Sequence, residues 1–162
     1  MDNPAENIIE INDIDLITEL VNRSFITVAD EYGYTMENAS TFPAFIGSNV
    51  IANDIKNGLI IFGYKKDGEV IGCCGHSKHS DIIYKIKRLA VLPEYRHYGI
   101  GKRLMAHNEL IIKENGGSIA EVHLVNNNEK LKRWYTENNY REIAIEEVKG
   151  LPFKVCIMQK EL

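Results

Sequence analysis

The spacing of apolar residues along the chain predicts a mixed α/β protein. Some apolar residues fall in short runs or alternate with polar ones, as in strands, and others recur every three or four positions, as on one face of a helix. Strands are expected at Ile8–Ile11, 59–64, 70–74, 82–92, Ile119–Val125, 143–148 and 153–158. Helices between strands and a closing hairpin indicate a mixed, mostly antiparallel sheet of about seven strands with flanking helices.

Helical spacing and stop signals place four helices among these strands. Helices are expected from Asp13 or Asp15 through Val21, at 44–56, from Gly99 to a stop at 115–117, and at 128–138. Asparagine and aspartate favour helix starts, and glycine favours helix ends. The segment 25–45 is aromatic and acidic, and Gly33 and Pro43 interrupt it, so it is expected to be irregular.

The composition is that of a globular protein, and the length suits one domain over residues 1–162. Hydrophobic residues make up 44% of the chain and charged residues 26%. The formal net charge of -4 disfavours broad nucleic-acid binding, which depends on basic patches. No apolar run approaches the ~18 residues of a membrane span, and residues 1–4 are too polar for a secretory signal. The odd number of cysteines forms no disulfide framework, so a cytoplasmic location is expected.

The segment from Val91 to Lys102 has the chemistry of a phosphate site. A strand ends at Pro93, a short loop follows, and two glycines open an amphipathic helix. The first amides of a helix have no internal partner, glycine lets a phosphate approach the backbone closely, and the arginine and lysine add positive charge. The candidate diphosphate site comprises Arg96, His97, Tyr98, Gly99, Ile100, Gly101 and Lys102.

Two other phosphate loops do not fit this segment. The dinucleotide fingerprint needs a third glycine where this chain has Leu104. The P-loop needs serine or threonine after its lysine, where this chain has Arg103. A helix that merely begins with glycines is the alternative that this pattern leaves open.

Two motifs resemble those of the GNAT superfamily of N-acetyltransferases. Arg96-x-x-Gly99-x-Gly101 follows a Val-x-Pro strand end, as in the acetyl-CoA motif of that superfamily. The family's second motif, Asn-x-x-Ala-x-x-Leu-Tyr-x-x-x-Gly-Phe, is similar to Asn128-x-x-Leu131-x-x-Trp134-Tyr135-x-x-x-Asn139-Tyr140. The closing stretch 151–155 also looks like that of a bacterial subgroup of the superfamily.

The resemblance implies a coenzyme site between two strands that splay apart, the fourth at 82–92 and the fifth at Ile119–Val125. The pantetheine arm of acetyl-CoA would lie in the gap and pair with backbone groups of Leu89, Ala90 and Val91, in the manner of an added strand. Acetyl-CoA is therefore the expected cosubstrate.

The resemblance also implies roles on the last helix. Tyr135 would protonate the departing thiolate. Asn128 would lie near the coenzyme, although asparagine is also a good helix N-cap. Asn139 stands where the family has glycine and is expected to adopt positive φ, which asparagine tolerates.

The motifs do not identify the base that deprotonates the amine. Some family members have a glutamate on the fourth strand, but this chain has Tyr-Lys-Ile-Lys at 84–87. Glu121 and His123 are the candidates, because strand alternation puts both on one face of the fifth strand. Solvent-facing strand residues and a water chain to bulk solvent are the alternatives.

One further cluster has the residue types of metal ligands: Cys73, Cys74, His76 and His79. Adjacent strand residues point to opposite faces, so both cysteines do not readily bind one metal. A buried strand that leads into a polar turn is the expected structure, and no metal is expected.

The resemblance implies acetyl transfer to a primary amine by direct attack in a ternary complex. The acceptor is expected to be a small molecule, with a peptide or protein amine as the alternative. A non-catalytic acyl-CoA sensor is the alternative from another class, favoured by the missing strand carboxylate. Asp30, Glu31 and Glu37 lie where the family's substrate lip forms and are either attractants for a cationic amine or a solvated loop. A homodimer is a further expectation, since many relatives pair through C-terminal strands.

Overall fold

The computed structural model describes residues 7–162, so the expectation for residues 1–4 lies outside the described residues. The strands are β1 (Ile8–Ile11), β2 (Ile60–Lys66), β3 (Glu69–Lys78), β4 (Ile83–Val91), β5 (Ile119–Val125), β6 (Arg141–Glu147) and β7 (Lys154–Glu161). The helices are α1 (Ile14–Tyr32), α2 (Ser48–Lys56), α3 (Ile100–Glu114) and α4 (Glu129–Glu137), with short 3-10 helices at Pro43–Phe45 and Pro93–Tyr95. Across residues 7–162, no helix combines the length and apolarity that a bilayer crossing requires.

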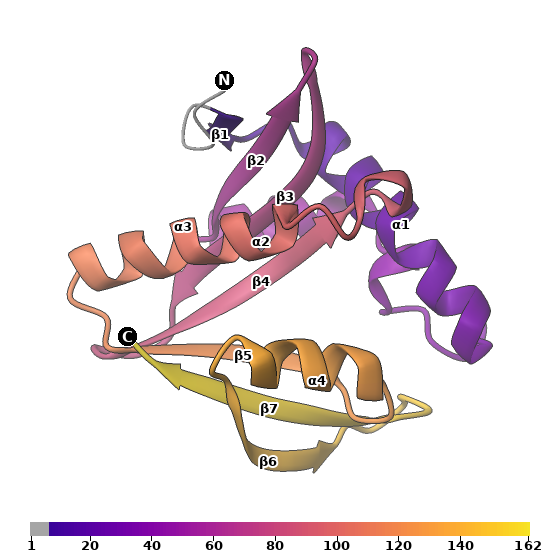
Figure 1. Cartoon of the computed structure of the whole chain (residues 1–162). Coiled ribbons are helices and arrows are strands. Elements are labelled where there is room, and N and C mark those ends of the chain that lie inside the picture. The colour runs from indigo at the N-terminus through magenta and orange to yellow at the C-terminus, as the bar shows by residue number, and fades with distance from the viewer. Residues whose placement is uncertain (1–6) are drawn as a thin grey trace.

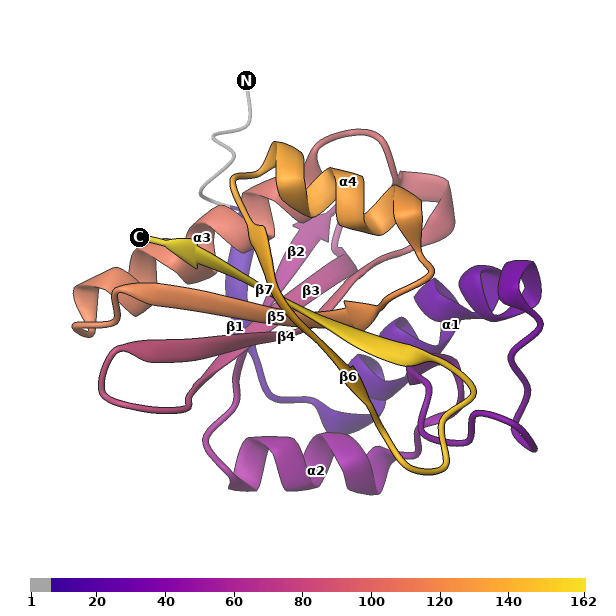
Figure 2. The same cartoon turned by 90° about the horizontal axis from the view of Figure 1, so that it is seen from below.

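The seven strands form one sheet in the order β1-β2-β3-β4-β5-β7-β6. Every neighbouring pair is antiparallel except β4 and β5, which are parallel. Helices α3 and α4 lie on one side of the sheet, and α2 lies on the other side (Figure 2). Helix α1 packs against α2 and against β3 and β4. The predicted mixed, mostly antiparallel sheet is confirmed.

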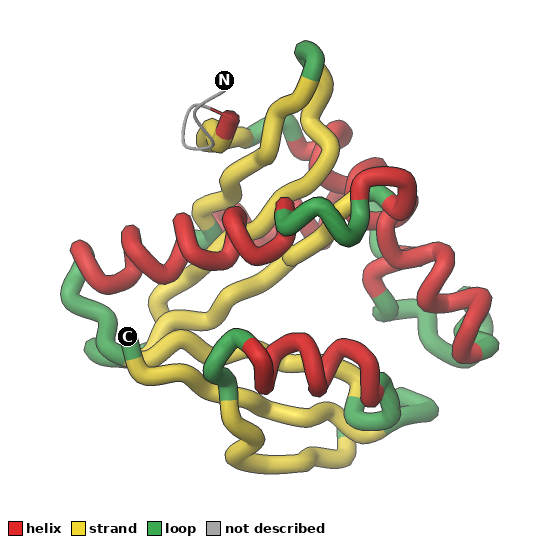
Figure 3. Tube along the Cα trace, in the orientation of Figure 1, coloured by secondary structure: helices red, strands yellow, loops and turns green. Residues whose placement is uncertain are grey.

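Strands β4 and β5 pair only where both begin. Their register joins Ile83 to Ile119 and Lys85 to Glu121, with one pair between them. Beyond Lys85, β4 has no partner on that edge, and the two strands diverge (Figures 1 and 3). The predicted splay is therefore present, and it exposes the backbone edge of the second half of β4.

The core lies on both sides of β2 to β5. Helix α3 buries Leu104 and Ile112, which recur at helical spacing, and α1 buries Ile17 and Val21 in the same cluster. Each such fully buried side chain contributes about 1.5–3 kcal/mol relative to an exposed one. This burial fixes α3 against β4, and thereby fixes the loop that joins them.

Helix α1 is longer than predicted. The chain stays helical from Phe25 to Tyr32, where irregular structure was expected, and Gly33 ends the helix with a φ of 71°. Thr27 and Val28 are β-branched and weaken the local helical signal, but tertiary contacts hold this part of α1 to the loop after β4. Helix α2 begins at Ser48 rather than at 44, because Pro43–Phe45 forms a separate 3-10 turn.

Strand β3 also continues beyond its predicted end. His76, expected in a polar turn, pairs with Ile86 of β4 and is 2% exposed. Its Nδ1 lies 2.7 Å from Oδ1 of Asn108 on α3, and this buried hydrogen bond satisfies that ring nitrogen. The last hairpin is longer as well, since β6 begins at Arg141 and β7 extends to Glu161.

Candidate active site

Six consecutive backbone N–H groups, from His97 to Lys102, donate no hydrogen bond to any group of residues 7–162. The amide before them donates to the carbonyl of Pro93, and the amide of Arg103 donates to that of Gly99. Residue 97 and Gly99 have φ values of 69° and 77°, and these left-handed residues turn the chain between the 3-10 helix and α3. A series of unpaired amides ahead of a helix N-terminus is a favourable binding site for phosphate.

The side chain of Arg96 fixes this loop in place. Its Nε donates to the carbonyl of Val91 at 3.2 Å, and its guanidinium also donates to Thr27 Oγ1 at 3.0 Å and to the carbonyl of Ser24. In the structure this guanidinium anchors the loop to α1 and β4, and it keeps its positive charge because its partners are neutral oxygens. The exposed side chain of Lys102 and the helix dipole add further positive charge.

A β-bulge interrupts β4 directly before the predicted coenzyme-binding residues 89–91. The register with β3 shifts between Cys73 and Gly75, and Arg88 has a φ of 57°. The Arg88 side chain reaches α2, where its Nε lies 2.8 Å and its Nη2 2.7 Å from Oδ2 of Asp54. A bulge bends its strand and redirects the residues that follow. The ion pair therefore helps set how the unpaired edge of β4 faces the gap.

Tyr135 is held in the interior by α4. The helix begins at Asn128, whose side chain accepts a hydrogen bond from the amide of Leu131 at 3.1 Å, which confirms the predicted N-cap. The same Asn128 oxygen accepts from the hydroxyl of Tyr32 at 3.3 Å, so it also links α4 to α1. Tyr135 itself is 6% exposed. Asn139, just after α4, has the predicted positive φ, at 70°.

The Tyr135 hydroxyl makes no hydrogen bond within the described part of the chain, yet it is not closed to solvent. Among residues 7–162, Tyr34 has the only side-chain oxygen or nitrogen that is closed to solvent without a partner. Burial raises the pKa of Tyr135 well above its usual value. The hydroxyl therefore stays protonated at physiological pH and is able to donate to a ligand.

Glu121 and His123 lie on one face of β5, as predicted, and bond to each other. Nε2 of His123 lies 2.7 Å from Oε1 of Glu121, and Nε2 of Gln159 on β7 donates to Oε2 of Glu121 at 2.7 Å. Burial acts to raise the pKa of Glu121, but the hydrogen bonds from Gln159 and His123 and the charge of Lys85 outweigh it, and the pKa is lowered. An ionised Glu121 favours the proton on Nε2 of His123, which leaves Nδ1 as an acceptor.

Replacing Glu121 with glutamine should therefore lower stability at neutral pH but not in acid. The folded-state pKa of Glu121 is lowered, so its contribution is complete above the unfolded value of about 4.3 and is lost as pH falls through the folded value. Urea unfolding of Glu121→Gln and the unchanged protein at pH 7 and at decreasing pH measures this. A difference in unfolding free energy that stays constant into acid would contradict it.

Aromatic side chains cover the same face of the sheet near the end of β5. Tyr34, Phe42 and Phe153 pack together with ring centroids 5.0–6.3 Å apart, and Val125 of β5 packs against them. Val125 is two positions beyond His123, so strand alternation places both on one face, about 7 Å apart along the strand. Beside this cluster, residues 37–41 and 148–151 line an open hollow of about 320 Å³.

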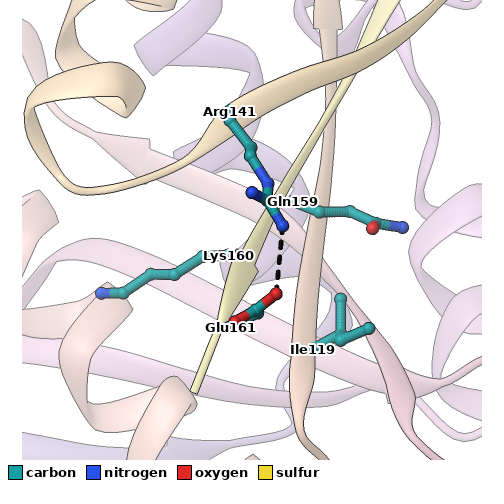
Figure 4. Close-up of a pocket in the computed structure, with 5 residues that line it drawn as sticks. All are labelled: Ile119, Arg141, Gln159, Lys160 and Glu161. Atoms are coloured by element: carbon teal, nitrogen blue, oxygen red, sulfur yellow. Dashed lines mark hydrogen bonds and ion pairs between the residues drawn. The ribbon is translucent and has the colours of Figure 1, made fainter.

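A second hollow, of about 30 Å³, lies at the opposite end of β5, where Arg141 bonds to Glu161 at 3.0 Å (Figure 4). It is lined there by Ile119, the first residue of β5, and by residues 159–161. A volume of this size suits about one water molecule. It is too small for a substrate and does not include the loop at 97–102.

Comparison with known proteins decides the family. The sequence model described as an acetyltransferase (GNAT) domain matches residues 57–142, which is more than half of the chain. The chain belongs to the GNAT acetyltransferase family. The matched region contains the loop at 97–102, both splayed strands and α4.

One curated relative of this GNAT protein matches about half of the chain. An uncharacterised N-acetyltransferase of Chlorobaculum tepidum is 34% identical over 79 residues, which is 49% of this chain and 48% of that relative. The match thus spans about half the length of that curated relative.

Solved structures share the fold. The PaiA N-acetyltransferase of Thermoplasma acidophilum, in complex with coenzyme A, has a TM-score of 0.71 at 20% identity and covers 96% of this chain and 98% of its own. A GNAT family acetyltransferase of Elizabethkingia anophelis with acetyl-CoA bound has a TM-score of 0.64 at 19% identity, over 72% of this chain and 84% of its own.

Several residues of this GNAT site were not found from the sequence. Gln159 bonds to Glu121 through strand pairing across 38 positions, and Asp54 bonds to Arg88 across 34. Neither pair has a local spacing signal, because strand order and helix packing create them. Trp134 was noted in a motif, but its position near Gly101 is also decided by tertiary packing.

Replacing Gly101 with alanine should weaken coenzyme binding and leave the fold intact. A Cβ at this position would meet no atom closer than 3.7 Å, and the backbone φ is not positive. The added methyl group would point at Leu89, Val91 and Trp134, beside the unpaired edge of β4. We expect KM for acetyl-CoA to rise about tenfold. Thermal unfolding is the check on folding, and Ala106→Ser, exposed on the same helix, is the control. An unchanged KM would contradict the expectation.

Proposed function

We propose that this chain transfers an acetyl group from acetyl-CoA to a primary amine of a small molecule. The main support is the run of unpaired amides from His97 to Lys102, next to the edge of β4 that β5 leaves free. These groups fit a diphosphate followed by an extended arm, because the amides bind the phosphates and the strand edge pairs with the amides of the arm. Gly99 keeps the approach open, since no atom lies within 4 Å of where its Cβ would be.

The side chains around the gap fit a direct transfer. His123, held by Glu121 through Nε2, would accept a proton from the amine on Nδ1. The amine nitrogen would then form a bond to the acetyl carbon, and the backbone amide of Leu89 would donate to the carbonyl oxygen as it gains charge. The carbon–sulfur bond would break, and Tyr135 would donate its hydroxyl proton to the departing thiolate. The second proton that the nitrogen loses on becoming an amide would restore the tyrosine hydroxyl, and His123 would release the first proton to solvent. Glu121, with its lowered pKa, is the positioning group in this scheme, not the base.

The geometry supports assigning the acceptor to the face of the sheet with His123. Period-two alternation places Val125 and its aromatic neighbours beside His123 on that face. The hollow of about 320 Å³ beside these residues has both Glu37 and Lys149 in its lining, so its lining carries one charge of each sign. Glu31 pairs with Lys130 at 3.2 Å on the surface. A hollow of this size favours a small amine over a protein surface.

Thiol release from acetyl-CoA tests this function directly. The purified chain is given acetyl-CoA and a panel of small primary amines, and free thiol is measured with and without each amine, alongside calorimetry with CoA. Amine-dependent release is the expected result. Heat of CoA binding without thiol release, for the whole panel and at alkaline pH, would favour the non-catalytic sensor instead. No heat with CoA would contradict both functions.

A further inference from the structure

Four residues from three elements meet beside the first turn of α3. A Cβ at Gly101 would lie 3.7 Å from Cζ2 of Trp134, 3.8 Å from Cγ2 of Val91 and 3.9 Å from Cδ1 of Leu89. Gly101 belongs to α3, Trp134 to α4, and the other two to β4. The indole therefore reaches from α4 to the start of α3, next to the part of β4 that β5 leaves unpaired.

This position of the indole lies on the path of the coenzyme that the proposed function requires. The diphosphate would bind at the amides up to Lys102, and the thioester would lie at Tyr135, which directly follows Trp134 in α4. An arm between these two points runs along the free edge of β4, past Leu89 and Val91. It passes Gly101 where the indole lies about one methyl group away from the glycine backbone.

We propose that Trp134 is a coenzyme-binding residue whose indole moves away from the start of α3 when the pantetheine arm enters and then packs along that arm. The side chain is only partly buried, so it is free to change rotamer without opening the core. A large, flat, mostly apolar ring offers much contact area to an extended chain. The inference rests on the proposed function, because it assumes an acyl-CoA at this site.

Intrinsic fluorescence gives a direct readout, because Trp134 is the only tryptophan in the sequence. Selective excitation of tryptophan during a CoA titration should give a saturable change in emission, with the Kd that calorimetry gives. ADP has the diphosphate but no arm, so it should bind at the loop without changing the emission. Pantetheine, which is the arm alone, should change the emission at high concentration.

Variants of Trp134 test its contact with the pantetheine arm by calorimetry, independently of fluorescence. Trp134→Leu should raise the Kd for CoA about tenfold, measured by calorimetry, and leave the Kd for ADP unchanged. Trp134→Phe should restore most of the CoA affinity, because it keeps a ring. Thr136→Ala, on the exposed side of the same helix, is the matched control and should change neither Kd. Thermal unfolding of each variant identifies any that fails to fold.

The outcomes separate this inference from the proposed function. If CoA binds with heat but leaves the emission unchanged, or if ADP changes it as much as CoA does, the role of Trp134 is wrong and the proposed function stands. If Trp134→Leu weakens CoA and ADP equally, the residue supports the loop and does not contact the arm. If CoA gives no heat at all, the proposed function itself fails.

Discussion

Replacing Tyr135 with phenylalanine should lower kcat by about a hundredfold, with little change in KM for acetyl-CoA. Burial raises the pKa of this hydroxyl, so it stays protonated over the working pH range and is always able to donate. The thiolate that leaves the acetyl group would lose that donor in the variant, whereas the ring that fills the core would remain. Steady-state rates at saturating amine and acetyl-CoA measure the effect.

The chain offers a matched control in Tyr140. Its ring packs edge-on against that of Tyr135 at 5.4 Å, and its hydroxyl donates to Glu109 at 2.8 Å. Tyr140→Phe removes a buried hydrogen bond to a carboxylate, which Lys160 still contacts at 2.9 Å, and should cost about 1–3 kcal/mol of stability. It should leave kcat within a fewfold of the unchanged protein. Equal losses of kcat in both variants would mean that Tyr135 acts through packing alone.

Replacing His123 with glutamine should lower kcat at neutral pH by at least about a hundredfold. Glutamine can keep a hydrogen bond to Glu121 but has no basic nitrogen, so the amine would lose its proton acceptor. The deficit should shrink as pH rises, because a larger share of the amine is then already deprotonated. The measurements are kcat and kcat/KM for the amine from neutral to alkaline pH.

Two comparisons make the result for His123 specific. Glu121→Gln should give a smaller loss of kcat, since it removes the group that orients the imidazole and leaves the base itself. KM for acetyl-CoA should change little in either variant, because neither side chain belongs to the loop at 97–102. If the His123→Gln enzyme has a normal rate at neutral pH, the base is water or another residue.

The residues of the loop and the last helix were predictable because their signals are local. Pro93 ends a strand, Gly99 and Gly101 open a helix, and Asn128 caps the next one, each through the backbone preferences of one residue. The shared face of Glu121 and His123 follows from strand alternation alone. These features need no knowledge of what packs against them.

The errors in the prediction occur where distant parts of the chain decide local structure. Thr27 remains helical beside Arg96, which is 69 positions away and donates to its hydroxyl. His76 lies inside β3 instead of in a turn, because Asn108 offers it a buried partner from α3. Burial of a polar residue is costly unless it has a hydrogen-bond partner. The spacing of residues in the sequence does not show which distant residue will be that partner.

The sequence by itself determined the order of the elements, the class of sheet and the helix start at Gly99 that leaves the amides of residues 97–102 unpaired. Only the tertiary structure decided which side chains contact one another around that loop and the neighbouring strands. It made Arg96 an anchor on α1, joined Gln159 to Glu121, and placed Trp134 near Gly101. The physical reason is that helix starts and strand alternation depend on neighbours in the chain, whereas hydrogen-bond partners and ring contacts depend on how the strands pair and the helices pack.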